Sequence, residues 1–137
     1  MKYRAPRFLF RRHELLRRVQ GGERFMEIGA ADLALTCELL QRFESGLAVD
    51  FTEDLPQSYA ALPDALRERL EISNVDVMTQ GLPDDFDCVV ACEVIEHIED
   101  DAGFAARLYE SLRPGGQLLI SMPARAKYWT VHDELVG

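Results

Sequence analysis

The chain has 137 residues, of which 47% are hydrophobic and 28% charged, with nine glycines, six prolines and three cysteines. This length suits one domain that buries roughly two-thirds of its unfolded surface, and the composition excludes collagen-like, low-complexity and wholly disordered chains. Three widely spaced cysteines cannot form a disulfide framework, and no apolar run reaches the roughly 20 residues that span a bilayer. Arginines interrupt the apolar residues near the N-terminus, so a secretory signal is not expected there. We therefore expect a soluble, cytoplasmic domain with no transmembrane segment.

Charge is distributed unevenly along the chain. Residues 1–24 carry eight Lys or Arg and two acids, a net +6, whereas the remaining residues carry seven Lys or Arg and 22 acids, a net −15. Nucleic-acid binding needs clustered cations to neutralise phosphates. An acidic body of this kind therefore argues against a nucleic-acid partner.

The basic N-terminal segment, residues 1–22, is predicted to be a helix. Phe8, Leu15 and Val19 recur at helical spacing, and arginines lie between them. We favour a helix that docks on the acidic body. The alternative is an amphipathic surface helix that contacts anionic lipid or RNA.

Apolar periodicity and turn residues predict the order of elements. A helix over 8–20 ends at Gly21-Gly22 and a strand follows over 24–28; Asp32 is then the expected N-cap of a helix over 33–43. Ser45-Gly46 is expected to end that helix before a strand over 46–49. The remaining expected elements are a loop or broken helix over 51–70 with a helix near 64–70, strands over 72–75 and 86–91, a helix over 101–112, and a strand over 117–122.

Five short strands separated mostly by helices predict an α/β fold with a doubly wound, mostly parallel sheet. Sheets of this type bind ligands beyond the carboxyl ends of their strands. Acids recur at these ends: Glu27 closes the first strand, Asp50 the second, Asp76 the third and Glu93 the fourth. A glycine turn before a helix can receive an anionic group, and an acid after the second strand can bind ribose hydroxyls. Together they favour a nucleoside ligand.

The segment from Phe25 to about Pro123 resembles the class I S-adenosylmethionine-dependent methyltransferases. The resemblance rests on FMEIGAAD, AVDF, VDVMTQGLPDDFDCVV, EVIEHIED and LRPGGQLLISMP, in that order. Among members of that family, the sequence is most similar to the quinone-pathway O-methyltransferases and their uncharacterised relatives. The resemblance implies a Rossmann-like sheet of order 3-2-1-4-5 in residues 23–123, followed by a truncated C-terminal loop over 124–137. The last two strands of the family's sheet would be missing.

The resemblance also implies a role for each strand-end residue with S-adenosylmethionine as cofactor. Glu27 and Gly29 would hold the methionine end, beside the backbone of Ala30, Ala31 and Asp32. Asp50 would bind the ribose, with Phe51 next to it in the cofactor site, and Asp76 with the Val77 backbone would face the adenine. Cys92 and Glu93 would line the methyl-donor side.

Two departures from the family pattern stand out. The glycine loop has Ala31 and Leu33 where the family usually has further glycines. Ala31 would cost about 1–2 kcal/mol if it must adopt a left-handed conformation, and Leu33 would be crowded if the helix and the strand approach closely there. Without the two missing strands, the fifth strand would have an unpaired edge. Weak or lost cofactor binding and self-association through that edge are the expected consequences.

His97 is the candidate catalytic base for removing a proton from a hydroxyl acceptor, against the alternative of a structural histidine. Glu93, Glu96 and His97, with His132 as a fourth ligand, have the spacing of a metal cluster found in some relatives, but we do not predict a metal. The expected function is methyl transfer to a small molecule, more readily at oxygen. The alternatives are a catalytically silent domain used for binding or self-association and, less well supported because G-x-G-x-x-G is absent, an NAD-dependent oxidoreductase.

Overall fold

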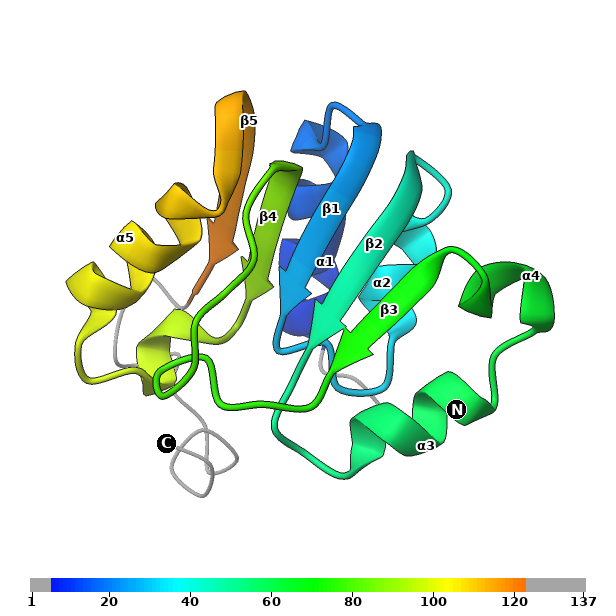
Figure 1. The fold of residues 1–137 in the computed structure, drawn as a ribbon. Coiled ribbons are helices and arrows are strands. Elements are labelled where there is room, and N and C mark those ends of the chain that lie inside the picture. Colours follow the sequence, from blue (N-terminus) through cyan, green and yellow to red (C-terminus); the bar gives the residue numbers. More distant parts are fainter. Residues whose placement is uncertain (1–5, 123–137) are drawn as a thin grey trace.

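A five-stranded parallel sheet flanked by helices forms the computed structural model, which describes residues 6–122 (Figure 1). The strand order β3-β2-β1-β4-β5 confirms the predicted topology, and every pair of neighbouring strands is parallel. The elements in chain order are α1 (Pro6–Arg18), β1 (Gly22–Ile28), α2 (Ala34–Leu39), β2 (Phe43–Val49), α3 (Asp54–Ala60), α4 (Asp64–Arg67), β3 (Leu70–Ser73), β4 (Phe86–Cys92), the 3-10 helix η1 (Ile95–His97), α5 (Asp101–Glu110) and β5 (Leu112–Ser121).

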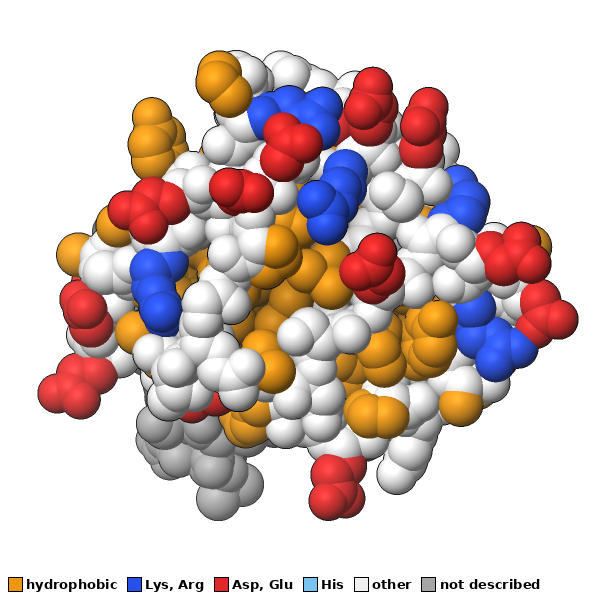
Figure 2. All heavy atoms as spheres, in the orientation of Figure 1, with side chains coloured by type: hydrophobic (Ala, Val, Ile, Leu, Met, Phe, Trp, Pro, Cys, Tyr) orange, Lys and Arg blue, Asp and Glu red, His pale blue; other side chains and the backbone are white. Residues whose placement is uncertain are grey.

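Two hydrophobic clusters cover the two faces of the sheet, because successive side chains of a strand point to opposite faces. Phe25 of β1 packs with Leu15 of α1 and Leu39 of α2 on the face behind the sheet in Figure 1. Met26 packs on the other face with Phe104 of α5. The β3–β4 connection has no helix and covers part of this front face with its own apolar side chains, and Figure 2 shows apolar surface in the hollow beside it.

The basic helix α1 docks on the body, as the favoured interpretation predicted. Leu15 is 5% exposed within the core, and Arg12 lies 3.9 Å from Glu38 of α2. No helix among residues 6–122 is long and apolar enough to cross a membrane.

Several predicted boundaries were wrong. The helix after β1 covers only Ala34–Leu39, and Leu33, not Asp32, is its N-cap residue, although an Asp32 oxygen accepts a hydrogen bond from the Ala34 N–H at 3.2 Å. Ser45 and Gly46 lie inside β2 and end no helix. A Cβ on Gly46 would overlap the Phe25 ring, so this glycine serves close packing between β2 and β1.

The loop or broken helix predicted over 51–70 is confirmed as two short helices, α3 and α4, although α4 ends at Arg67. The strand predicted over 72–75 was misplaced by two residues, because β3 runs from Leu70 to Ser73 and excludes Val75. The last strand was predicted over 117–122, but β5 begins at Leu112, and its pairing with β4 shifts register between Phe86 and Cys88. The predicted C-terminal loop over 124–137 falls outside the described residues.

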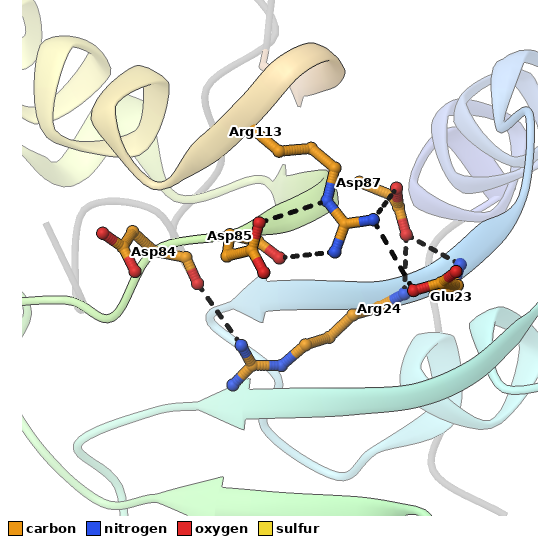
Figure 3. Close-up of polar contacts among 6 residues, drawn as sticks. All are labelled: Glu23, Arg24, Asp84, Asp85, Asp87 and Arg113. Atoms are coloured by element: carbon orange, nitrogen blue, oxygen red, sulfur yellow. Dashed lines mark hydrogen bonds and ion pairs between the residues drawn. The ribbon is translucent and has the colours of Figure 1, made fainter.

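A polar network joins β1, β4 and β5 at the end of the sheet opposite their carboxyl ends (Figure 3). One Asp87 oxygen accepts hydrogen bonds from the Glu23 and Arg24 N–H groups at 2.7 and 2.8 Å. Arg113 lies 2.9 Å from the other Asp87 oxygen. These contacts fix the starts of the strands and thereby the positions of their far ends.

Candidate functional site

The carboxyl ends of the five strands lie along one edge of the sheet because all the strands are parallel. We call this edge the rim. The five strands reach it at their last residues, which are, from β1 to β5, Ile28, Val49, Ser73, Cys92 and Ser121. Two predicted site residues lie within strands, Glu27 in β1 and Cys92 at the end of β4. Most of the others follow β1, β2 and β4 at the rim, while Asp76 and Val77 lie in the connection that leaves β3.

The turn after β1 has the left-handed backbone that its missing glycines would have favoured. Gly29, Ala31 and Leu33 have φ angles of 77°, 46° and 64°. Ala31 is exposed, whereas Leu33 is fully buried in the core, so only the leucine gains apolar burial at its strained position. The Gly29 and Ala30 N–H groups both donate to the Val49 carbonyl, at 2.8 and 3.2 Å. These two N–H groups are therefore already used within the fold, a constraint that the sequence did not predict.

Asp50 connects the turn after β1 to the turn after β2. It is 8% exposed, and its Oδ2 accepts from the Ala31 N–H at 2.7 Å while Oδ1 accepts from the Thr52 N–H at 3.1 Å. The Asn74 amide donates to the Asp50 and Thr52 carbonyls, both at 2.8 Å, and thereby connects the end of β3. A carboxylate offers about four acceptor positions, so Asp50 retains capacity to accept from a ligand's hydroxyls.

Glu27 lies beneath the rim and is 3% exposed. Burial raises its pKa to about 8, despite a hydrogen bond from the Thr36 hydroxyl that favours the ionised form. The carboxyl is therefore largely protonated at neutral pH. A cationic group bound beside it would favour its ionisation.

Glu93 and its neighbours form a polar cluster where β4 and β5 end. Glu93 has a φ of 62°, and its Oε1 lies 2.7 Å from Arg11 Nε of α1. The Ser121 hydroxyl lies 3.0 Å from Cys92 Sγ and 3.2 Å from Glu93 Oε1. Burial raises the pKa of Cys92 to about 11, so it is a thiol and not a thiolate.

Phe51 lies next to Asp50, and Asp76 and Val77 lie where the adenine side was predicted. Phe51 is 75% exposed directly after Asp50. Asp76 is exposed and accepts from the Met78 N–H at 2.9 Å, which shapes the turn after β3, while the Val77 side chain is buried in the front core.

His97 lies on η1, with its Nε2 3.9 Å from Glu96 Oε1. Among residues 6–122, no three His, Cys, Asp or Glu side chains are grouped to hold a metal ion, so Glu93, Glu96 and His97 do not form such a group here. His132, the suggested fourth ligand, lies outside the described residues.

A family model described as a methyltransferase domain matches residues 26–118, from the middle of β1 to the middle of β5. The chain belongs to the class I S-adenosylmethionine-dependent methyltransferase family. The matched region of this methyltransferase contains every predicted site residue, but it does not include α1.

Curated relatives share part of their length with this methyltransferase. It is 31% identical over 107 residues to the mitochondrial ubiquinone biosynthesis O-methyltransferase of Schizosaccharomyces pombe, covering 76% of the chain and 39% of that relative. It is 39% identical over 61 residues to a probable S-adenosylmethionine-dependent methyltransferase of Mycolicibacterium smegmatis, covering 44% of the chain and 24% of that relative. The chain therefore spans about two-fifths or less of these two relatives.

Solved structures share the fold. The DhpI–SAM–HEP complex matches with a TM-score of 0.72 at 16% identity, covering 87% of this chain and 55% of that one. The N-methyltransferase NodS of Bradyrhizobium japonicum, in complex with S-adenosylhomocysteine, matches with a TM-score of 0.69 at 21% identity, covering 82% and 61%. Identities this low establish the common fold of this methyltransferase and nothing finer.

Sequence reasoning missed two residues of the rim. Arg11 is one of several arginines on a basic helix, and nothing in their spacing distinguishes the one that reaches Glu93. Ser121 is the last residue of β5 and lies inside the strand predicted over 117–122, and its position opposite Cys92 follows from the β4–β5 register. The acid excess after residue 24 did indicate that α1 would dock on carboxylates.

Proposed function

We propose that this methyltransferase domain binds S-adenosylmethionine along the rim and methylates an oxygen of a small-molecule acceptor. The observation that carries the proposal is Asp50, a nearly buried carboxylate fixed by N–H groups from two rim turns. The Schizosaccharomyces pombe relative, an O-methyltransferase of ubiquinone biosynthesis, supports oxygen as the accepting atom.

The residues at the rim fit the chemical parts of this cofactor. Asp50 accepts from the ribose hydroxyls, exposed Phe51 offers an apolar face to the adenine, and Asp76 with the Val77 backbone binds at the adenine's polar edge. Glu27 and Gly29 lie on the methionine side, where an ammonium group would be paired by ionised Glu27. Cys92 and Glu93 line the methyl-donor side.

S-adenosylmethionine supplies an already activated methyl group, so the protein's work is to position the acceptor and manage one proton. We assign proton removal from the acceptor hydroxyl to His97 on η1, a step worth roughly 10²–10⁴-fold. The partner of the domain is a small molecule. We propose no nucleic-acid partner. We propose that the domain acts in the cytoplasm, where its three free cysteines stay reduced. We also propose that it self-associates through the outer edge of β5.

Calorimetric titration with S-adenosylhomocysteine tests the binding proposal. Asp50→Asn should weaken binding by about 10- to 100-fold, because it removes charge-assisted hydrogen bonds of about 1.5–3 kcal/mol. Asp64→Asn, at an exposed acid of α4, is the matched control and should leave binding unchanged. Equal affinities of the Asp50→Asn variant and the parent chain, or no heat at millimolar ligand, would contradict the proposal.

A catalytically silent domain is the second candidate, and the turn after β1 favours it. Ala31 and Leu33 hold strained backbone there, and the Gly29 and Ala30 N–H groups are already bonded to Val49. Absence of binding by both the chain and its Ala31→Gly variant would decide for this candidate.

A further inference from the structure

A cavity of about 330 Å³ lies against α1 and α2, on residues that belong to no part of the rim. Leu9, Arg12, His13, Leu16 and Arg17 line it from α1, Glu38 from α2, and Arg42 from the turn before β2. Ligand pockets begin at about this volume, so the occupant is small.

The lining is cationic although the whole chain carries a net charge of −9. Three arginines line the cavity and one acid opposes them, which leaves a surplus of two positive charges. Glu38 lies 3.9 Å from Arg12, a long contact for an ion pair. Arg17 pairs with Glu14, which lies outside the lining, and is still 63% exposed. Arg42 donates to the Leu16 carbonyl and is thereby held at the cavity.

The walls between the charges are apolar. Leu9 is 44% exposed although it is a large hydrophobic residue, and Leu16 is partly buried against the core behind it. An occupant that buries Leu9 gains apolar contact as well as charge pairing. These two features together favour an anion with a short apolar group.

We propose that this cavity binds a small phosphate monoester that carries a short alkyl or aryl group. A phosphate monoester has a charge of about −1.5 to −2 at pH 7, which matches the surplus of two, whereas a carboxylate or a phosphodiester supplies only one. Guanidinium groups pair with phosphate oxygens through two parallel N–H donors, and His13 adds a ring donor. The phosphate accepts from Arg12, Arg17 and Arg42 while the apolar group contacts Leu9 and Leu16.

Titration of the full chain with hexyl phosphate, followed by ¹H–¹⁵N NMR, tests this site. An occupant of this size should bind with a dissociation constant on the order of a millimolar. Arg17→Ala should weaken binding about fivefold, as expected for loss of one exposed charge pair. Arg18→Ala is the matched control: Arg18 also lies 2.9 Å from Glu14 and is 60% exposed, but it does not line the cavity. It should bind hexyl phosphate like the parent chain.

Three further probes make the outcome decisive. Inorganic phosphate should bind more weakly than hexyl phosphate, and hexanol should not bind. The proposal would be overturned if hexanol or inorganic phosphate bound as tightly as hexyl phosphate, or if the Arg17 and Arg18 variants lost the same affinity for hexyl phosphate. It would also be overturned if hexyl phosphate did not bind at 10 mM, about ten times the expected dissociation constant.

Vesicles identify the source of the phosphate monoester once hexyl phosphate binds. Sedimentation with phosphatidate in phosphatidylcholine vesicles, lost in Arg17→Ala and kept in Arg18→Ala, would assign a lipid headgroup. Absence of sedimentation would assign a soluble ester. Both outcomes support the cavity as a monoester site, and neither depends on cofactor binding at the rim.

Discussion

Arg11 Nε lies 2.7 Å from Glu93 Oε1, and this ion pair connects the N-terminal helix to the end of β4. Both side chains are largely buried, with exposed fractions of 20% and 12%. Because little solvent reaches this ion pair, removing one partner leaves the other charge with neither a counter-charge nor full hydration. Arg11→Ala should therefore lower the free energy of unfolding by about 1–2 kcal/mol in urea denaturation.

A double-mutant cycle separates this ion pair from the loss of the arginine stem. Glu93→Gln alone, Arg11→Ala alone and both together should give a coupling energy of about 1 kcal/mol. A coupling near zero would show that the Arg11–Glu93 pair does not help to hold α1 on the body.

The short apolar runs that end in turn residues predicted five strands in a mostly parallel sheet, and the resemblance to the methyltransferase family implied their order, which the structure confirms. The sequence did not predict the true extent of β2, since Gly46 has the appearance of a helix stop. Only the packing of Phe25 against Gly46 explains why a glycine lies inside a strand. Long-range packing of this kind has no local pattern, and the same holds for Arg113, whose partners Asp85 and Asp87 belong to β4 and the turn before it.

The positions of Glu27 and Asp50 at the carboxyl ends of the first two strands were predictable, because those strand ends were. The hydrogen bonds from the Gly29 and Ala30 N–H groups to the Val49 carbonyl were not predictable, because they depend on how closely β1 and β2 approach there. Ala31 has the positive φ angle at which strain was expected, whereas the left-handed backbone of Leu33 was not predicted. The roles of the individual rim residues in binding and catalysis stay predictions.

Ala31→Gly and Leu33→Gly should have opposite effects on stability, although both replace a left-handed residue. At exposed Ala31 the change relieves strain and should raise the free energy of unfolding by about 0.5–1 kcal/mol after the greater entropy of unfolded glycine is deducted. At fully buried Leu33 the change removes a core side chain and should lower it by about 3 kcal/mol. Thermal and urea unfolding of both variants measure the difference, and a gain in stability at Leu33 would contradict the assignment of its side chain to the core.

Glu27 should make the domain less stable as the pH rises from about 5 to 8. Its pKa is about 8 when folded and near 4.5 ordinarily, so between these values the folded chain keeps a proton that the unfolded chain releases. The stabilisation is fully present below pH 4.5 and declines by up to about 1.4 kcal/mol per pH unit until the folded pKa is passed.

Glu27→Gln should remove this decline while keeping a group that can accept from Thr36. Urea unfolding at three pH values gives the slope for each variant. Glu44→Gln, at an exposed acid of β2, controls for the change in net charge. Identical slopes for Glu27→Gln and the parent chain would show that the carboxyl is ionised in the folded protein.

Asp87 should be the most sensitive acid of the network in Figure 3, because one of its oxygens accepts two backbone N–H groups and the other pairs with Arg113. Asp87→Ala leaves the two N–H donors without their acceptor and Arg113 without its nearest carboxylate, and should cost about 2–4 kcal/mol of unfolding free energy. Asp84→Ala is the matched control, since the Arg24 side chain bonds the carbonyl of Asp84 and an alanine retains that group. It should change stability by less than about 0.5 kcal/mol. Similar losses in the two variants would place the stabilisation in overall charge and not in the joining of β1, β4 and β5 at Asp87.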